Sequence, residues 1–392
     1  MQHAFSGIKV LGVTSAYAAP FAAYQLALHG ADVINVEEPG KGDYARTLGD
    51  AHAKALIERK MGAAFLAHGA GKMSLTLNLR SAQGKEIFLK LARDADVIME
   101  NQRAGSMDGL GLGYEDVRRI NPRIIYCSLT GYGQTGPLAH RAGHDLNYLA
   151  RSGVLGMQGP SDAPPQVPGF QLADISGALW SVIAVLGALR ERERTGAGAV
   201  LDVAMADGSL GFASFALGAL FSGDDQGRGR SPLAGAIAPY GTYLSSDGQP
   251  VTLAALEPKF WSAFCAGAGI ETDMTALLPG PHQDGWRQRL RDLFATRSRD
   301  EWAAFGARHD CCVEPVLRPD ELRADPHLAA RQLFFDLAVG DQRVAHFRTP
   351  ISPLDLAPTP APPPGQHTDA ILAEAGLEPG QIAALRGAGV VR

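Results

Sequence analysis

Short apolar runs alternate with longer, partly apolar stretches along the first half of the chain. Apolar runs at 8–13 and 31–36 flank an apolar stretch at 20–28, which is followed by Gly30. Short apolar runs are typical of strands, and a glycine just past an apolar stretch commonly ends a helix. The pattern therefore predicts strand, helix, strand, which is a βαβ unit.

The same alternation continues to about residue 203. It predicts strands at 74–79, 96–99, 123–129 and 200–203, and helices at 81–91 (capped by Ser81), 175–194 and 207–220. Alternating strands and helices form a parallel, doubly wound sheet that is covered on both faces. We therefore expect a Rossmann-like α/β domain. In such sheets sites form where loops follow the C-terminal ends of strands. The corresponding loops here are 37–46, 101–113 and 131–145.

The pattern changes after residue 221. A polar, glycine-rich stretch at 222–230 precedes hairpin signals at 240–244 and 251–255, and then helical patterns at 258–267, 283–296 and 299–308. A proline-rich segment at 358–364 separates these from a last helix at 368–375. The predicted organisation is a large α/β domain at 1–221, a smaller α+β domain at 222–318, and a C-terminal segment at 319–392 that returns to the large domain.

Composition narrows the class of protein. The chain has 392 residues, 46% hydrophobic and 20% charged, with a net charge of -5 and no basic block, so it is expected to be globular and not to bind nucleic acid. Its four cysteines form no C-x-x-C pair, which favours reduced thiols and no metal site. The N-terminus lacks a signal-peptide pattern, and the longest apolar run, 178–189, is short for a membrane span. We therefore expect a cytoplasmic protein that does not bind a membrane.

Glycine-rich stretches do not indicate a nucleotide-binding loop. Residues 109–113 lack the G-x-G-x-x-G spacing, and Gly71-Lys72 is followed by Met73 where a phosphate-binding loop has serine or threonine. Simple turns account for both. Arg103 follows the strand 96–99, where its forked guanidinium could bind a phosphate, although the spacing alone favours a solvated surface arginine.

A histidine and a carboxylate stand at the ends of neighbouring elements. His144 lies in Gly143-His144-Asp145-Leu146-Asn147-Tyr148, just after the glycine-rich turn 131–137, and Asp174 precedes a long apolar helix. Such a pair could hold one reacting carbon between two proton carriers. Taken singly, His144 could be a structural histidine, Asp174 a helix cap, and Glu257 a charge in the first turn of a helix.

Several segments together resemble the class III CoA-transferase family, which includes carnitine dehydratase, bile-acid-inducible protein F and a branch of α-methylacyl-CoA racemases. The matching segments are 30–37, 101–105, 110–115, 131–137, 195–198, 325–328 and 365–368. The racemase motif G-H-D-x-N-Y stands at 143–148, a signature of the form A-P-Y-x-x-Y at 238–243, and A-x-E-P-x-F at 255–260. The resemblance is closest to the racemase branch.

The resemblance implies two kinds of chemistry at Asp174. In racemases a His/Asp pair, here His144 and Asp174, moves the α-proton of an acyl-CoA, while Glu257 supports the histidine and Asp145 assists. The enolate oxygen would then be stabilised by backbone N–H groups near the start of the helix that carries Asp174. In transferases the residue matching Asp174 is the nucleophile and forms an aspartyl-CoA intermediate.

The predicted CoA-binding residues are Arg103, Arg46, Lys72, Tyr132 and Gly133. Many relatives carry an arginine where this chain has Glu38 and a second cation where it has Met73, so Lys41, Arg46 or Lys72 would have to compensate. Tyr17 stands where some formyl-type transferases have a glutamine, which argues against a formyl or oxalyl substrate.

Three functions follow from these observations. The first is a racemase of 2-methylacyl-CoA thioesters, the second a CoA-transferase between carboxylic acids, and the third an acyl-CoA-binding protein without turnover. In each, coenzyme A arrives as part of the substrate and no cofactor is bound permanently. The resemblance also implies an interlocked homodimer, in which the large domain of one subunit faces the small domain of the other.

Overall fold

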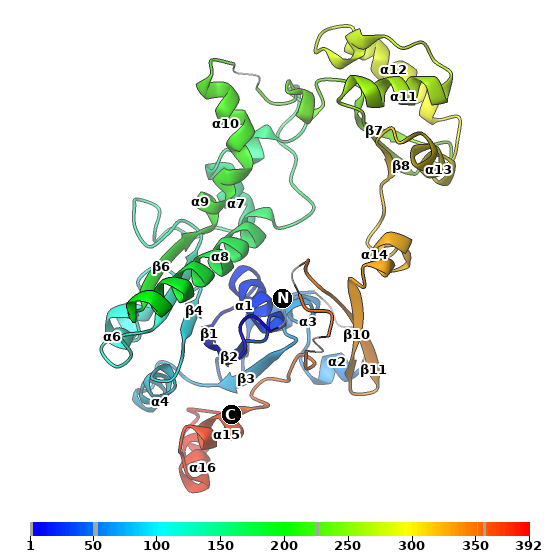
Figure 1. Cartoon of the computed structure of the whole chain (residues 1–392). Helices are drawn as coiled ribbons and strands as arrows, with labels where there is room; N and C mark the ends of the chain where they lie inside the picture. The colour runs from blue at the N-terminus through cyan, green and yellow to red at the C-terminus, as the bar shows by residue number, and fades with distance from the viewer. Residues whose placement is uncertain (1–2, 50–53, 225–226, 351, 356–357) are drawn as a thin grey trace. The chain divides into compact units, whose positions relative to one another are not determined.

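The computed structural model describes residues 3–49, 54–224, 227–350, 352–355 and 358–392 (Figure 1). The chain divides into two compact units. The first, the sheet unit, comprises Met1–Ser152, Phe170–Gly211 and Pro326–Arg392, and the second, the small unit, comprises Gly153–Gly169 and Phe212–Asp325. The chain therefore passes from the sheet unit to the small unit after residue 211, whereas the prediction placed this boundary after residue 221. The small unit also includes the segment Gly153–Gly169 from the first half of the chain.

The sheet unit is built on six parallel strands in the order β3-β2-β1-β4-β5-β6. Their bounds are β1 Lys9–Val13, β2 Asp32–Glu37, β3 Lys72–Thr76, β4 Val97–Glu100, β5 Ile125–Thr130 and β6 Ala199–Ala204. The winding reverses between β1 and β4, and in open α/β sheets ligands bind in the crevice at this switch point. The predicted Rossmann-like sheet is confirmed, and the switch point fixes where to look for a site.

Helices cover both faces of the sheet. Leu11 and Val13 of β1 point into a buried cluster formed with α4, α6, α15 and α16, while α1 and α8 pack against each other. The helices of this unit are α1 Ala18–Leu28, α2 Lys54–Glu58, α3 Ala63–His68, α4 Ala82–Ala92, α5 Ser106–Leu110, α6 Tyr114–Arg118, α7 Asp145–Arg151, α8 Leu172–Thr195, α9 Met205–Leu210, α14 Pro326–Ala330, α15 Thr368–Glu374 and α16 Pro379–Gly387. By length and composition alone α8 could cross a membrane, but it packs along β5, β6 and α9, as a core helix does.

Local signals in the sequence account for some helix ends and fail at others. Ser81 caps α4 as predicted, because its hydroxyl accepts a hydrogen bond from Gly84 N at 3.0 Å. The predicted helix at 207–220 is wrong as a single element. It is divided into α9 and α10 (Ser214–Phe221) by a turn at Gly211–Ala213, close to the boundary between the two units.

The C-terminal segment closes the free edge of the sheet at β3. Ser74 N donates to His367 Nδ1 (3.1 Å), Thr76 N to Thr368 Oγ1 (3.2 Å), and Arg392 N to Thr76 Oγ1 (2.9 Å). An unpaired edge strand is a template for unwanted strand pairing, so these bonds also protect the edge. The segment contains an antiparallel hairpin that the hydrophobic pattern did not reveal, β10 Phe334–Val339 and β11 Gln342–Phe347.

The small unit is an antiparallel sheet covered by helices. Its strand order is β7-β8-β9, with bounds Tyr240–Leu244, Pro250–Ala254 and Val313–Pro315, and its helices beyond α10 are α11 Pro258–Ala268, α12 Gln283–Phe294 and α13 Arg299–His309. Its core is aromatic, with Phe264 stacked on Phe294 and on Trp302. The predicted hairpin and three helices of this unit are all present.

Candidate active site

A cavity of about 490 Å³ lies at the switch point of the sheet unit. We call it the His144 cavity. Its wall is built from the loops that follow β1, β4 and β5 and from the first turns of α7 and α8. The lining residues are Ala16, Tyr17, Ala18, Asn101, Gln102, Arg103, Ala104, Leu129, Thr130, Gly131, Ala139, Arg141, Ala142, Gly143, His144, Asn147, Tyr148, Asp174 and Met205. The structure therefore brings two of the predicted catalytic residues, His144 and Asp174, to one cavity.

His144 is fixed at the start of a helix. It is the N-cap residue of α7, with its N–H donating to Asn147 Oδ1 (3.0 Å) and its carbonyl accepting from Asn147 N (2.8 Å). Tyr148 Oη donates to Gly143 O at 2.5 Å, and a Cβ on Gly143 would meet the Tyr148 ring at 2.8 Å. The His144 side chain is exposed and lines the cavity, where a ligand can reach it.

Asp174 lies in the first turn of α8, and Asp145 holds that turn. The helix begins at Leu172, which makes Asp174 its third residue rather than its cap. Asp145 Oδ1 accepts hydrogen bonds from Ala173 N (2.6 Å) and Asp174 N (3.0 Å). These two N–H groups are therefore occupied, and the expectation that they stabilise an enolate oxygen does not fit the structure.

The environment of Asp174 suits a group that exchanges a proton near neutral pH. Burial, and secondly the nearby charge of Asp145, raise the pKa of its carboxyl to about 7. Burial also raises the pKa of Asp145, although its bonds from Asp174 N and Ala173 N oppose that effect. Among the described residues, Asp174 is the only carboxylate that lines the His144 cavity.

Glu257 belongs to the small unit. It is the N-cap residue of α11, and its side chain is exposed. The resemblance gives it the role of supporting His144, and that role stays a prediction.

Arg46 and Lys72 lie in the core of the sheet unit. The side chain of Arg46 is 1% exposed and forms a two-pronged ion pair with Glu37, Nη2 to Oε1 and Nε to Oε2, each at 2.7 Å. Lys72 is buried and donates to Pro20 O at 2.7 Å, and its burial lowers the pKa to about 8. Neither cation is free to bind a phosphate, so the structure removes both from the predicted CoA-binding set.

Arg103, Tyr132 and Gly133 differ in their positions. The guanidinium of Arg103 is exposed at the His144 cavity and has no partner among the described residues, as a phosphate-binding group requires. Tyr132 packs edge-to-face on Tyr148 at 5.1 Å, and Gly133 N donates to Thr130 Oγ1 at 3.0 Å with a φ of 86°. Tyr132 and Gly133 therefore support the turn after β5 and do not line the cavity.

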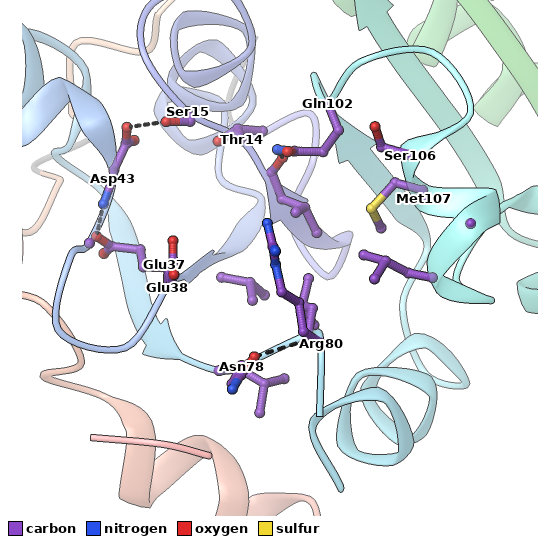
Figure 2. Close-up of a pocket in the computed structure, with 17 residues that line it drawn as sticks. Thr14, Ser15, Glu37, Glu38, Asp43, Asn78, Arg80, Gln102, Ser106 and Met107 are labelled. Atoms are coloured by element: carbon purple, nitrogen blue, oxygen red, sulfur yellow. Dashed lines mark hydrogen bonds between the residues drawn. The ribbon is translucent and has the colours of Figure 1, made fainter. Parts of the chain in front are cut away.

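A second cavity of about 500 Å³ opens beside the first, at the ends of β1, β2 and β3, and we call it the Arg80 cavity. Figure 2 shows the Arg80 side chain pointing into it, opposite Glu37, Asp43 and Gln102. Arg80 is the only cation that lines it, and no described residue pairs with its guanidinium. Glu38 also lines it but is paired with Lys41 at 2.9 Å. Gln102 lines both cavities.

Arg80 was not among the predicted site residues. The signal was present, because Arg80 follows β3 by four residues and precedes the cap of α4. The rule that selected Arg103, a cation at the C-terminal end of a strand, selects Arg80 equally well.

The sheet unit is thus a doubly wound α/β domain with two adjoining cavities at the C-terminal ends of its strands, where such sheets bind ligands. A family model, CoA-transferase family III, matches residues 5–368. Alpha-methylacyl-CoA racemase of Homo sapiens is 34% identical over 97% of this chain and 95% of its own length, and acetyl-CoA:oxalate CoA-transferase of Acetobacter aceti is 37% identical over 84% and 85%. A CAIB/BAIF family protein from Brucella suis has a TM-score of 0.82 at 32% identity, covering 96% of this chain and 100% of that one. The chain belongs to CoA-transferase family III and is an acyl-CoA enzyme.

Proposed function

We propose that this protein is a racemase of 2-methylacyl-CoA thioesters in which His144 and Asp174 exchange the α-proton. The thioester carbonyl acidifies the α-hydrogen. One of the two residues removes that proton from one face, and the other returns a proton from the opposite face. For one direction His144 is neutral and Asp174 protonated at the start, and for the other direction the states are exchanged. Each turnover inverts the α-carbon and leaves the thioester bond intact.

The observation that carries the proposal is the pairing of His144 and Asp174 on one cavity. The imidazole is exposed at the cavity, and the carboxyl has a pKa raised to about 7 by burial and secondly by the charge of Asp145. A proton carrier works best when its pKa lies near the operating pH. A carboxylate nucleophile has no need of such a shift, so this environment favours proton transfer.

The two cavities fit the two ends of a CoA thioester. We place the nucleotide in the Arg80 cavity and the acyl group in the His144 cavity, with the pantetheine arm passing Gln102. Arg80 would bind phosphate oxygens of the nucleotide, because a guanidinium bonds two oxygens at once, and Arg103 would bind a phosphate oxygen at the end of the nucleotide that lies next to Gln102. Coenzyme A then enters and leaves with each substrate.

Replacing Arg80 by glutamine should raise the KM for an acyl-CoA about 10-fold to 100-fold, because a charge-assisted hydrogen bond contributes about 1.5–3 kcal/mol. The kcat should stay unchanged. The matching acyl-pantetheine lacks the nucleotide, so its kinetics should not respond to the substitution. Arg93→Gln, which changes an exposed arginine that lines neither cavity, is the control. Equal effects on both substrates would place Arg80 outside the nucleotide site.

The pH dependence of stability tests the environment of Asp174. Its pKa is about 7 in the folded protein against the ordinary aspartate value of 3.8, so the folded state holds the proton more tightly than the unfolded chain does. The stability linked to this proton is complete below about pH 4 and is lost as the pH rises to 7. Asp174→Asn cannot ionise, so at pH 8 its free energy of unfolding should exceed that of the wild type by about 1–3 kcal/mol, and it should melt at a higher temperature. The difference should vanish near pH 4. Thermal melts at the two pH values measure it, and a variant less stable at pH 8 would contradict the raised pKa.

A CoA-transferase is the second candidate. Asp174 is the only carboxylate that lines the His144 cavity among the residues that the structure describes, and the curated relatives include CoA-transferases. Asp174 would attack the thioester carbonyl and displace the CoA thiolate, giving an acyl-aspartyl anhydride. The thiolate would then attack the aspartyl carbonyl and release the carboxylate, leaving an aspartyl-CoA thioester.

One assay separates these functions. A 2-methylacyl-CoA is incubated with the protein in deuterated water, with and without an acceptor carboxylate, and the products are read by mass spectrometry. Deuterium at the α-carbon without acceptor supports the racemase. Transfer of CoA to the acceptor, together with a hydroxylamine adduct at Asp174, would select the transferase instead. Binding with neither outcome would select an acyl-CoA-binding protein.

We further propose that the protein is a cytoplasmic homodimer in which Glu257 orients His144. Four exposed apolar side chains line one face of α8, at Leu179, Trp180, Ile183 and Leu186, and such a face is typical of a covered surface. Sedimentation equilibrium tests the dimer, and a monomer at micromolar concentration would exclude it.

A further inference from the structure

Tyr17 lines the His144 cavity and has no assigned role. It is the N-cap residue of α1, directly after β1, and its side chain is half-buried beside the cavity that His144 and Asp174 also line. Among the described residues its hydroxyl has no hydrogen-bond partner. A phenol that has no protein partner and faces a reaction cavity can donate its hydrogen bond to a ligand.

The backbone that carries Tyr17 is fixed from two sides. Asp43 Oδ1 accepts from Ser15 Oγ and Ala16 N, both at 3.0 Å. Asn101 exchanges two hydrogen bonds with the backbone of Ser15, at 2.9 Å and 2.8 Å. Ala16 has a φ of 69°, which a residue with a side chain rarely adopts and which persists only when its surroundings impose it. The turn therefore holds Tyr17 in place before any ligand binds.

The ring of Tyr17 is fixed as well. It meets the buried His68 edge-to-face at 4.6 Å, and Phe21 packs on the same imidazole at 5.3 Å. Burial, and secondly the charge of Lys72, lower the pKa of His68 to about 3, so the imidazole is neutral and contacts the rings as a neutral group. A donor that is aimed in advance stabilises developing charge without any reorganisation.

Tyr17 lies close enough to the reacting groups for their charges to act on it. Burial raises the pKa of its phenol, and the charges of Asp174 and then Asp145 raise it further. The hydroxyl therefore keeps its proton throughout the neutral range and can donate it in a hydrogen bond.

Several other neutral donors around the cavity already have a protein partner. The N–H groups of Ala173 and Asp174 donate to Asp145. The Gln102 and Asn101 amides each use one of their two N–H donors, on Val13 O at 3.2 Å and on Ser15 O at 2.8 Å. The Asn147 amide has a free N–H, but its side chain is exposed to water, where a hydrogen bond stabilises charge less.

We propose that the Tyr17 hydroxyl donates a hydrogen bond to the thioester oxygen of the substrate and stabilises the negative charge that develops there. This inference rests on the proposed binding of the acyl group in the His144 cavity. When the α-proton leaves, the C–H electron pair forms the Cα–C double bond of the enolate, and the carbonyl π electrons move to the oxygen. Return of a proton to Cα reverses these shifts, and Tyr17 keeps its own proton throughout. The same donor would serve a tetrahedral intermediate if the protein were a transferase.

The test is Tyr17→Phe, which removes the hydroxyl and keeps the ring on His68. The kcat for α-proton exchange of a 2-methylacyl-CoA should fall about 10²-fold to 10³-fold, with the KM changed less than about threefold, because the bond strengthens as charge develops. Tyr44→Phe, at an exposed tyrosine that lines neither cavity, should match the wild type. An unchanged kcat in Tyr17→Phe would overturn the inference. So would a kcat that falls in Asn147→Ala but not in Tyr17→Phe.

A second measurement does not depend on turnover. The probe is 2,2-dimethylpropanoyl-CoA, which has no α-hydrogen, labelled with ¹³C at its carbonyl. In the infrared spectrum the carbonyl band of the bound probe should lie at lower frequency than in solution, and should return toward the solution position in Tyr17→Phe. A band that is the same in both proteins would exclude the hydrogen bond. A wild-type protein that shifts the band but does not exchange the α-proton would reject the racemase and leave the role of Tyr17 supported.

Discussion

The His144→Ala variant is expected to lose α-proton exchange by about 10³-fold, within the range that a positioned proton carrier contributes. His144 and Asp174 line the same cavity and are the two proposed proton carriers. The substitution removes one of them, so the Asp174 carboxyl alone cannot serve both faces of the α-carbon. The measurement is deuterium uptake at the α-carbon of a single enantiomer of a 2-methylacyl-CoA. In the racemase proposal a deuteron must enter from the face opposite the one that lost the proton, so inversion and exchange should fall together.

The matched control is His140→Ala, which removes an exposed histidine four positions earlier that does not line the cavity. This variant should exchange the α-proton at the wild-type rate. Full exchange in His144→Ala would remove His144 from proton transfer. Loss of exchange with retention of CoA transfer to an acceptor would show that His144 is needed for proton exchange but not for CoA transfer.

The second large effect concerns stability. Arg46→Met is expected to lower the free energy of unfolding by about 3–5 kcal/mol, because it leaves the carboxylate of Glu37 buried without its counter-ion. The Glu37 side chain is 0% exposed, and the Arg46 guanidinium also donates to Pro362 O at 3.1 Å and covers the Phe65 ring at 3.6 Å. Urea unfolding followed by circular dichroism measures the change. The double variant Glu37→Leu with Arg46→Met should recover much of the loss, since no charge is then left buried.

Arg118→Ala provides the comparison. Arg118 also forms an ion pair at short distance, 2.6 Å to Glu115, but both side chains are more than half exposed, and such pairs contribute less than about 1 kcal/mol. An Arg46→Met variant with wild-type stability and a much higher KM for acyl-CoA would contradict the structural role and restore Arg46 to the CoA-binding set.

The sheet could be predicted from the sequence because its strands are buried and continuous. All six residues of β5 are buried, so they appear as an apolar run between turn residues. The helix cap at Ser81 was predictable because its partner, Gly84 N, lies only three residues away. Features that depend on distant partners were not predictable in this way. The break between α9 and α10 coincides with the boundary of the two units, which the local pattern does not encode.

The same distinction separates the site residues. His144 and Asp174 were recognised as a pair through the family motif, and the fold brings both to the cavity at the switch point. Arg46, Lys72 and Arg80 look alike as single cations near strand ends. Only the structure shows that Glu37 and Pro20 occupy the first two and that the third faces a cavity. The role of Asp145 in holding the first turn of α8 depends on residues 28 and 29 positions away, beyond any local pattern.

The bonds that close the β3 edge have a consequence for biosynthesis. Thr76 and its partner Arg392 are 316 positions apart in the chain. At a synthesis rate of about 5–20 residues per second, this separation corresponds to about 15–60 s during which β3 has been made and its final neighbours have not. The whole small unit is translated within that interval. The nascent chain therefore carries an open strand edge while the ribosome completes the rest, and this edge is where we expect a chaperone to bind during synthesis.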